Sequence, residues 1–345
     1  MTTHEKYMQR CIELAQNGLG TTYPNPLVGS VIVYNDKIIG EGWHQKAGEP
    51  HAEVNAINSV KNPDLLSKST IYVSLEPCSH FGKTPPCSDL IIAKNIPNIV
   101  IGTIDPFAQV SGNGIQRLKD AGRDVTVGIL AEKCHELNKR FFTFHTQKRP
   151  YVILKWAESQ DGFIAPKEKQ KLEPIWLSNT YSRQLVHKWR SEEQAILVGT
   201  QTVLDDNPRL DVRDWKGQNP VRLVIDRKGK TNLNCRIYDG KSKTIVFTEE
   251  KKPAIDQCIF ENVIFGNRLV FEIMEIAYNH EIQSIIIEGG RQTLQSFIDA
   301  NLWDEARIFK TKVTLSDGIK SPEIKGKTQS ITAILDDELL MVKNL

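Results

Sequence analysis

The sequence predicts an α/β protein made of two different domains. Three observations lead to this prediction: the chain of 345 residues is long for one domain, strand-like and helix-like segments alternate through both halves, and the alternation restarts after a break at residues 141–149. Strands that alternate with helices are typical of sheets covered by helices. We therefore expect one domain over residues 1–147 and a second over residues 148–345.

Composition and charge narrow the class of protein. The chain is 40% hydrophobic and 25% charged, and its formal net charge of +2 does not suggest a nucleic-acid or membrane-surface binder. Residues 1–18 contain no secretory signal, and no run of eighteen apolar residues occurs. We expect a cytoplasmic protein with reduced cysteines, of which only Cys78 and Cys87 are close together in the sequence.

The first half begins with an amphipathic helix, since Met8, Cys11, Ile12 and Ala15 recur at helical spacing. Residues 27–44 then predict two strands joined by a turn at Asn35-Asp36. The elements expected after this hairpin are helices at 50–60, 85–95 and 113–122, the last ended by Gly122, and strands at 69–78, 98–106 and 124–130.

The second half repeats the alternation with different segments. Apolar runs predict its strands, and amphipathic runs predict its helices, whereas the tail after about residue 315 carries no recognisable motif. The expected strands are 150–159, 195–199, 221–226, 244–248 and 284–290, and the expected helices are 182–192 and 291–301.

A zinc site is the first functional prediction. His51 and Glu53 stand at the start of a predicted helix, and Cys78 and Cys87 bracket a stiff, proline-containing loop. One imidazole and two thiolates give zinc three ligands and leave a fourth position open for water, whose pKa the metal lowers toward neutrality. A helix N-terminus at Cys87 favours its thiolate. Glu53, close to the metal without being a ligand, can transfer protons.

Other interpretations of these residues remain open at this stage. A cysteine pair nine positions apart can be incidental, and His44 or His80 can replace His51 as a ligand. A structural zinc site needs four protein ligands, and His80 is the only plausible fourth. In that case the domain would be a binding module rather than an enzyme.

The motif H-x-E followed by P-C resembles the cytidine/deoxycytidylate deaminase superfamily. Eight residues rather than two separate the cysteines, and this longer form, with the segment at 23–33, is similar to the riboflavin-biosynthesis deaminases. The resemblance implies a cytidine-deaminase-like three-layer α/β/α domain and one Zn²⁺ held by His51, Cys78 and Cys87. It also implies Glu53 as the catalytic residue and Asn25 as a substrate contact.

A glycine pair carries the second functional prediction. The usual dinucleotide motif G-x-G-x-x-G is absent, but a predicted strand runs into Glu288-Gly289-Gly290 and then into a helix. Such a turn allows close approach of a pyrophosphate to a helix N-terminus, although a plain tight turn explains it equally well.

Residues 154–165 and 199–213 resemble the reductase domain of the bifunctional riboflavin-biosynthesis enzymes. The resemblance implies a dihydrofolate-reductase-like, Rossmann-type α/β domain that binds NADPH. It places the substrate at Lys155, Arg190, Asp206, Leu210, Arg213 and Glu288, where the arginines suit a ribose phosphate. It places the cofactor at Ala157, Trp176, Thr202, Asp206, Gly290, Arg291, Gln292, Thr293, Leu294, Gln295 and Ser296.

A lysine-rich insertion departs from the family pattern. Lys167, Lys169 and Lys171 are either a solvated loop or a contact to the 2′-phosphate of NADPH, the former being favoured. Pro174 stands where the family often has a substrate-contacting serine, so that contact is not assigned.

Together the two halves imply a bifunctional enzyme that deaminates a phosphoribosyl pyrimidine and then reduces its ribosyl group. A homo-oligomer, dimer or tetramer, is expected from the family, without nucleic-acid or membrane partners. The alternative is a deaminase of a nucleoside or tRNA base joined to a reductase outside riboflavin synthesis.

Overall fold

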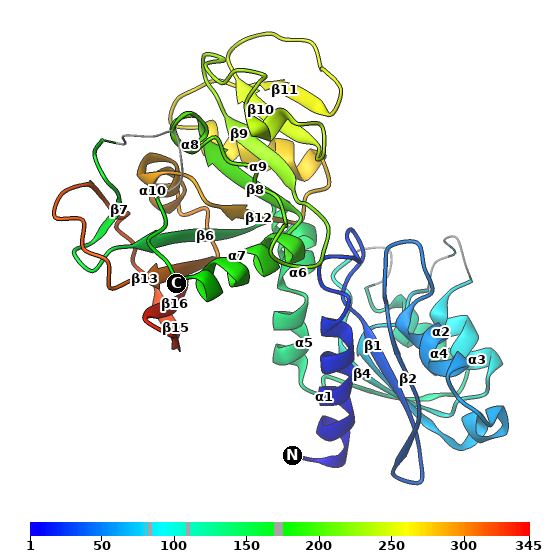
Figure 1. Cartoon of the computed structure of the whole chain (residues 1–345). Helices are drawn as coiled ribbons and strands as arrows, with labels where there is room; N and C mark the ends of the chain where they lie inside the picture. Colours follow the sequence, from blue (N-terminus) through cyan, green and yellow to red (C-terminus); the bar gives the residue numbers. More distant parts are fainter. Residues whose placement is uncertain (80, 82–84, 108–110, 169–174) are drawn as a thin grey trace. The chain divides into compact units, whose positions relative to one another are not determined.

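The structure is a computed structural model that describes all residues except 80, 82–84, 108–110 and 169–174. The chain divides into two compact units, Met1–Lys148 and Arg149–Leu345 (Figure 1). None of the helices in the described ranges is both long and apolar enough to cross a membrane.

The first unit is built on a five-stranded sheet in the order β2-β1-β3-β4-β5. Its first two strands form an antiparallel hairpin, and the turn residues Asn35 and Asp36 both have positive φ angles, of 48° and 56°. Short polar side chains tolerate this left-handed conformation, which explains why the turn could be predicted. The strands are β1 (Gly29–Tyr34), β2 (Lys37–Trp43), β3 (Thr70–Leu75), β4 (Asn98–Thr103) and β5 (Asp124–Val127).

Helices cover both faces of this sheet and give three layers. On one face Met8 and Cys11 pack against Val31 and Tyr72, and on the other the helices pack against Ile71 and its neighbours. The three-layer α/β/α prediction is thus confirmed. The helices are α1 (Thr3–Gln16), α2 (Ala52–Asn58), η1 (Pro63–Lys68), α3 (Cys87–Ala93), α4 (Asn113–Asp120), α5 (Ala131–Leu137) and α6 (Lys139–Gln147).

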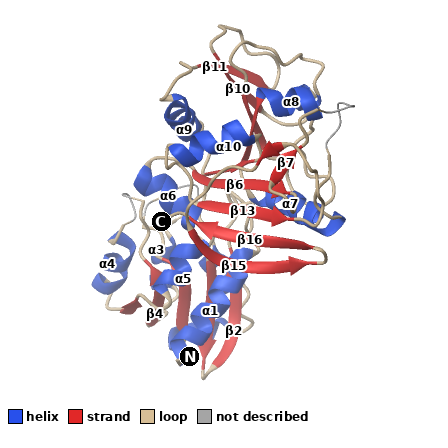
Figure 2. Cartoon of the chain, turned by 90° about the vertical axis from the view of Figure 1, so that its left-hand side faces the viewer, coloured by secondary structure: helices blue, strands red, loops and turns tan. Residues whose placement is uncertain are grey.

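The second unit contains a nine-stranded sheet in the order β11-β10-β9-β8-β12-β6-β13-β16-β15. The strands from β11 to β13 run parallel, and β16 and β15 continue the sheet as an antiparallel hairpin, side by side with β13 and β6 in Figure 2. The nine strands are β6 (Tyr151–Glu158), β8 (Ala195–Gly199), β9 (Val221–Ile225), β10 (Thr244–Thr248), β11 (Cys258–Asn262), β12 (Ser284–Ile287), β13 (Glu305–Lys310), β15 (Lys327–Ile334) and β16 (Asp337–Lys343). A separate two-stranded antiparallel sheet is formed by β7 (Phe163–Ala165) and β14 (Ile319–Lys320).

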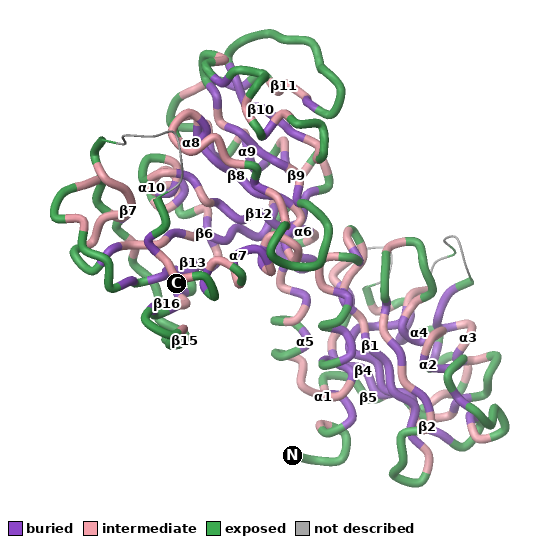
Figure 3. The backbone as a smooth tube through the Cα atoms, in the orientation of Figure 1, coloured by how far each residue is buried: buried purple, intermediate pink, exposed green. Residues whose placement is uncertain are grey.

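Two apolar clusters, one on each side, hold the helices of this unit to the sheet. We call the side that packs against Ile273, Leu294 and Phe297 the α10 face, and the side that packs against Val186 and Trp189 the α7 face. Figure 3 shows the strands between them as largely buried. The helices are α7 (Thr180–Glu192), α8 (Thr200–Asp206), η2 (Arg236–Tyr238), α9 (Leu269–Asn279) and α10 (Arg291–Asp299).

Candidate active sites

Three side chains of the first unit meet at one point. The Nδ1 atom of His51 lies 3.3 Å from the Sγ atom of Cys87 and 3.6 Å from that of Cys78, and all three donor atoms lie within 4.8 Å of one another. Tetrahedral zinc with ordinary bond lengths separates a nitrogen from a sulfur ligand by about 3.5 Å. The three residues therefore fit one zinc ion without rearrangement.

Local structure explains how these residues come together. His51 is the N-cap of α2, Cys87 is the first residue of α3, and Cys78 follows the end of β3. The backbone N–H of Cys87 points at the Sγ atom of Cys78, at 3.3 Å. The hydroxyl and the backbone N–H of Ser88 both donate to the carbonyl oxygen of Cys78, at 3.0 Å and 3.2 Å. Cys78 is thereby fastened to the start of α3.

Electrostatics in this site favour one thiolate and a protonatable carboxyl. Hydrogen bonding with Cys87 lowers the pKa of Cys78 to about 4, with a further contribution from His51. Glu53, in the first turn of α2, is only 3% exposed, and burial raises the pKa of its carboxyl to about 7. A carboxyl with such a pKa can both accept and release a proton near neutrality.

Asn25 belongs to a hydrogen-bonded pair beside the cluster. Its Nδ2 atom lies 3.1 Å from the Nε2 atom of His44, whose Nδ1 atom lies 3.2 Å from the carbonyl oxygen of Pro50. A carbonyl only accepts, so Nδ1 carries the proton and Nε2 accepts from Asn25. His44 therefore has a hydrogen-bonding role, with its ring 5.4 Å from that of His51. The other alternative ligand, His80, lies outside the described residues.

In the second unit, three predicted substrate residues form a partly buried ionic cluster. Arg190 donates from Nε and NH2 to the two carboxylate oxygens of Glu288, at 3.0 Å and 2.7 Å, and the Nζ atom of Lys155 lies 3.7 Å from the same carboxylate. Burial alone would raise the pKa of Glu288, but the charges of Arg190 and Lys155 lower it to about 2. Burial also lowers the pKa of Lys155. The cluster carries a net positive charge suited to an anionic substrate.

His187 is a residue of this site that sequence reasoning missed. It lies 3% exposed, one helical turn before Arg190 on α7. Its Nδ1 atom accepts from the backbone N–H of Arg213 at 3.4 Å, and its Nε2 atom lies 3.3 Å from Asp214. Burial, Arg190 and Arg213 lower its pKa. The three-residue spacing to Arg190 was the signal that could have identified it.

The glycine turn after β12 brings two predicted cofactor residues together, because the backbone N–H of Gly290 donates to Oγ1 of Thr202 at 3.1 Å. The two glycines differ in the space around them. A Cβ on Gly289 would lie 2.8 Å from the Cβ of Thr293, whereas a Cβ on Gly290 would meet only Oγ1 of Thr202, at 3.7 Å. Gly289 therefore allows Thr293 to pack closely against the turn, whereas Gly290 faces open space at the N-terminus of α10.

The remaining predicted reductase residues range from buried to exposed. Leu210 is buried in the apolar cluster of the α7 face, and Ala157 packs against that cluster. Leu294 is buried in the cluster of the α10 face, so the side chain of Leu294 is part of the hydrophobic core. Trp176 is 51% exposed, and Arg183 stacks 4.7 Å from its ring centroid. Lys167 pairs with Asp317 at the surface, and Lys169, Lys171 and Pro174 lie outside the described residues. Of the other predicted residues, Asp206 and Thr293 are partly buried, and Arg291 and Gln292 are exposed. The last three make hydrogen bonds within the chain: Arg213 donates to Asp211, Gln295 donates to Asp299, and Ser296 donates to the carbonyl oxygen of Thr293.

Comparison with known proteins agrees with both halves of this description. Residues 1–103 match the family described as the cytidine and deoxycytidylate deaminase zinc-binding region, and residues 150–316 match the RibD C-terminal domain. The chain is 37% identical over 320 residues to the riboflavin biosynthesis protein RibD of Aquifex aeolicus, covering 91% of this chain and 88% of the relative. It is 46% identical over 316 residues to RibD of Actinobacillus pleuropneumoniae, covering 88% and 82%.

Solved structures extend the similarity to the whole fold. The crystal structure of a diaminohydroxyphosphoribosylaminopyrimidine deaminase/5-amino-6-(5-phosphoribosylamino)uracil reductase from Thermotoga maritima has a TM-score of 0.91 and 36% identity, covering 99% of each chain. Acinetobacter baumannii RibD has a TM-score of 0.89 and 30% identity, again covering 99% of each chain. The chain therefore belongs to the RibD family of bifunctional deaminase/reductases of riboflavin biosynthesis.

Proposed function

We propose that this chain converts 2,5-diamino-6-(5-phosphoribosylamino)pyrimidin-4(3H)-one to 5-amino-6-(5-phosphoribitylamino)uracil. Residues 1–147 would deaminate the ring with zinc, and residues 148–345 would reduce the ribosyl group with NADPH. The observation that supports this most strongly is the His51, Cys78 and Cys87 cluster with the buried Glu53 beside it. Among the described residues the ligand set has three members, and three protein ligands are typical of catalytic rather than structural zinc.

In the deamination, zinc held by the three ligands would supply an activated water at the open position. Glu53 would transfer the two protons of the attacking water, one to the ring nitrogen and one to the leaving amino group, so that ammonia departs and a carbonyl remains. Burial raises the pKa of Glu53 to about 7, which suits a group that both gains and loses a proton in one cycle. Asn25, held by His44, would orient the pyrimidine.

In the reduction, bound NADPH would supply a hydride for C1′ of the ribosyl group in its imine form. Lys155 and Arg190 would hold the anionic substrate, and Glu288 would bind ribose hydroxyls while keeping both cations in position. The low pKa of Glu288 keeps it ionised, so it accepts rather than donates hydrogen bonds from these hydroxyls.

A substrate comparison tests the proposed function. We expect ammonia release from the phosphoribosyl pyrimidine and, with NADPH, its further reduction, but no turnover of cytidine or RNA. Turnover of cytidine or RNA alone would instead favour a nucleoside or tRNA deaminase. The proposal also includes a cytoplasmic homo-oligomer, dimer or tetramer, whose mass light scattering would measure.

Loss of a thiolate ligand is expected to remove the metal. We predict that Cys78→Ser and Cys87→Ser reduce zinc content from one ion per chain to background and abolish ammonia release, because two ligands remain for a metal that needs three or more. Cys235→Ser is the matched control, since this partly exposed cysteine belongs to the other unit. Elemental analysis of the purified chains measures the result, and full zinc retention in both ligand variants would contradict it.

The glycine turn gives a separate prediction for the cofactor. We expect Gly290→Val to weaken NADPH binding about tenfold or more, because the added side chain blocks close approach and removes hydrogen bonds to a charged group. Valine fits the free protein, since Gly290 has φ −64° and an open surrounding. Fluorescence titration of NADPH measures the change, and ammonia release should remain at the parental rate. Equal loss of both activities would indicate misfolding instead.

A further inference from the structure

A buried carboxylate precedes the first thiolate of the proposed zinc site. Glu76 follows the last residue of β3 and stands two residues before Cys78, and it is only 4% exposed. Its backbone N–H donates to the carbonyl oxygen of Thr103, at the end of β4, at 3.0 Å. The sheet therefore fixes the backbone of Glu76, and its carboxylate is left to hold other groups.

The carboxylate of Glu76 accepts four backbone N–H groups from the segment that leads into α4. Its Oε2 atom accepts from Asp105 at 3.3 Å and from Gly112 at 3.0 Å. Its Oε1 atom accepts from Gly114 at 2.9 Å and from Ile115 at 3.2 Å. N–H groups at the start of a helix have no partner within the helix, and an ionised carboxylate can accept two bonds at each oxygen. Glu76 thus joins the start of α4 to the zinc site.

The backbone of α4 also lies directly against this part of the chain. A Cβ atom added to Gly114 would clash with the carbonyl oxygen of Pro77, so the close approach needs glycine. One helical turn further along α4, the NH1 group of Arg117 donates to the carbonyl oxygen of Ser79 at 3.3 Å. The helix therefore holds the chain both before and after Cys78.

The same arginine reaches the segment of the second thiolate. Arg117 binds both carboxylate oxygens of Asp89, through Nε and through NH2, the latter at 2.9 Å. Asp89 lies in the first turn of α3, two residues after Cys87. A guanidinium that binds both oxygens of a carboxylate has a fixed orientation. α4 is therefore connected to both segments that carry a cysteine ligand.

We propose, on the basis of the proposed function, that Glu76 is a positioning residue that sets where Cys78 places its thiolate on the zinc. Arg117 supports this position by fixing Ser79 and Asp89. Glutamine at position 76 would keep the shape of the side chain, but its amide nitrogen would face two N–H groups that now have an acceptor. Because buried donors without an acceptor are costly, the segment that carries Cys78 would move.

The zinc affinity of the full chain, measured by competition with a chromophoric chelator, tests this role. We expect Glu76→Gln to weaken zinc binding about 10- to 100-fold, the usual effect of removing a group that orients a metal ligand. The side chain of Arg117 is 43% exposed, so Arg117→Gln leaves no buried charge and should fold normally. It should weaken zinc binding about threefold, as loss of an exposed ion pair predicts.

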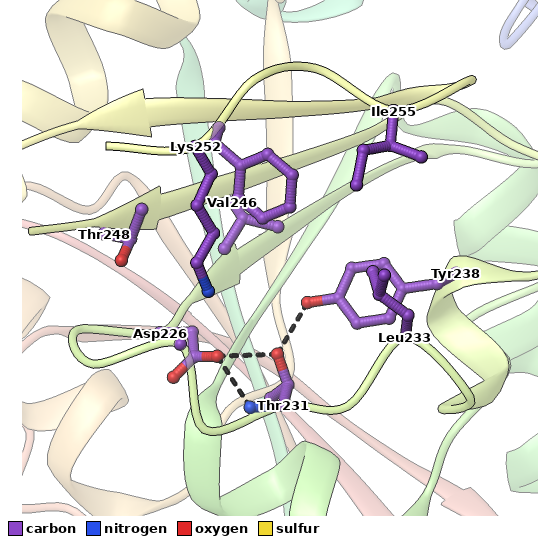
Figure 4. A pocket seen from close by; sticks show the side chains of 10 residues that line it. Asp226, Thr231, Leu233, Tyr238, Val246, Thr248, Lys252 and Ile255 are labelled. Atoms are coloured by element: carbon purple, nitrogen blue, oxygen red, sulfur yellow. Dashed lines mark hydrogen bonds between the residues drawn. The ribbon is translucent and has the colours of Figure 1, made fainter. Parts of the chain in front are cut away.

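Two matched controls change the same kinds of group away from the zinc. Asp226, a buried carboxylate of the second unit, lines a cavity of about 220 Å³ and accepts from the backbone N–H and the hydroxyl of Thr231 (Figure 4). Arg123 donates to the carbonyl oxygen of Ile92, at the other end of α3 from Cys87. Asp226→Asn and Arg123→Gln should both keep the parental zinc affinity.

Replacing zinc with Co²⁺ adds a measurement that distinguishes a moved ligand from a partly unfolded chain. The positions of the Co²⁺ absorption bands depend on the geometry of the ligands, whereas their intensity depends on the amount bound. We expect the bands to shift in Glu76→Gln and to stay unchanged in Asp226→Asn. Parental zinc affinity in both Glu76→Gln and Arg117→Gln, or weaker bands at unchanged positions, would overturn the positioning role and leave the zinc site intact. A parental chain that binds no zinc would instead overturn the proposed function.

Discussion

Replacing Glu53 with glutamine is expected to lower the rate of ammonia release by about 10² to 10⁴, the usual contribution of a positioned general acid–base group. Glutamine has nearly the same shape, so the buried position in the first turn of α2 should tolerate it. It cannot carry the proton that the carboxyl transfers. Zinc content, measured on the same preparation, and NADPH-dependent reduction of the deaminated pyrimidine should stay at the parental values.

The control for this experiment is Glu132→Gln, which removes an exposed carboxylate from the first turn of α5 in the same unit. Its rate should equal that of the parent. If Glu53→Gln retained both zinc and full ammonia release, Glu53 would have no part in the chemistry. The same variant separates a catalytic from a purely structural zinc, because a structural site would show no dependence on this carboxyl.

The deaminase site could be predicted almost entirely from the sequence because its geometry is local. His51 and Glu53 share one helix start, and Cys78 and Cys87 bracket one short loop, so few degrees of freedom remain once the elements are known. The adjacent contact between Asn25 and His44 could not be predicted in the same way. It depends on how two separate loops return to each other.

The reductase site depends on the tertiary fold to a greater extent. Lys155, Arg190 and Glu288 come from a strand, a helix and a turn far apart in the sequence, and only the sheet order brings them into one ionic cluster. The β15–β16 hairpin was missed because β15 is exposed along nearly its whole length and lacks the alternation of a half-buried strand.

The partly buried ionic cluster of Lys155, Arg190 and Glu288 leads to the second large effect. We expect Glu288→Gln to lower the free energy of unfolding of the second unit by about 3 kcal/mol at pH 7, because Arg190 and Lys155 would remain largely shielded from water without their counter-charge. Urea unfolding followed by tryptophan fluorescence measures this change. Asp317→Asn is the matched control: it breaks the exposed pair with Lys167, and such pairs contribute less than about 1 kcal/mol.

The effect of Glu288→Gln should depend on pH in a defined direction. The pKa of Glu288 is about 2 in the folded chain and near 4.5 when unfolded, so the unfolded state binds the proton more readily. The stabilisation by its charge is therefore complete above pH 4.5 and is lost as the pH falls toward 2. The difference between parent and variant should shrink across this range. A difference that stayed constant down to pH 2 would mean that glutamine disturbs packing, and that the charge of Glu288 is not what holds Arg190 and Lys155 in the site.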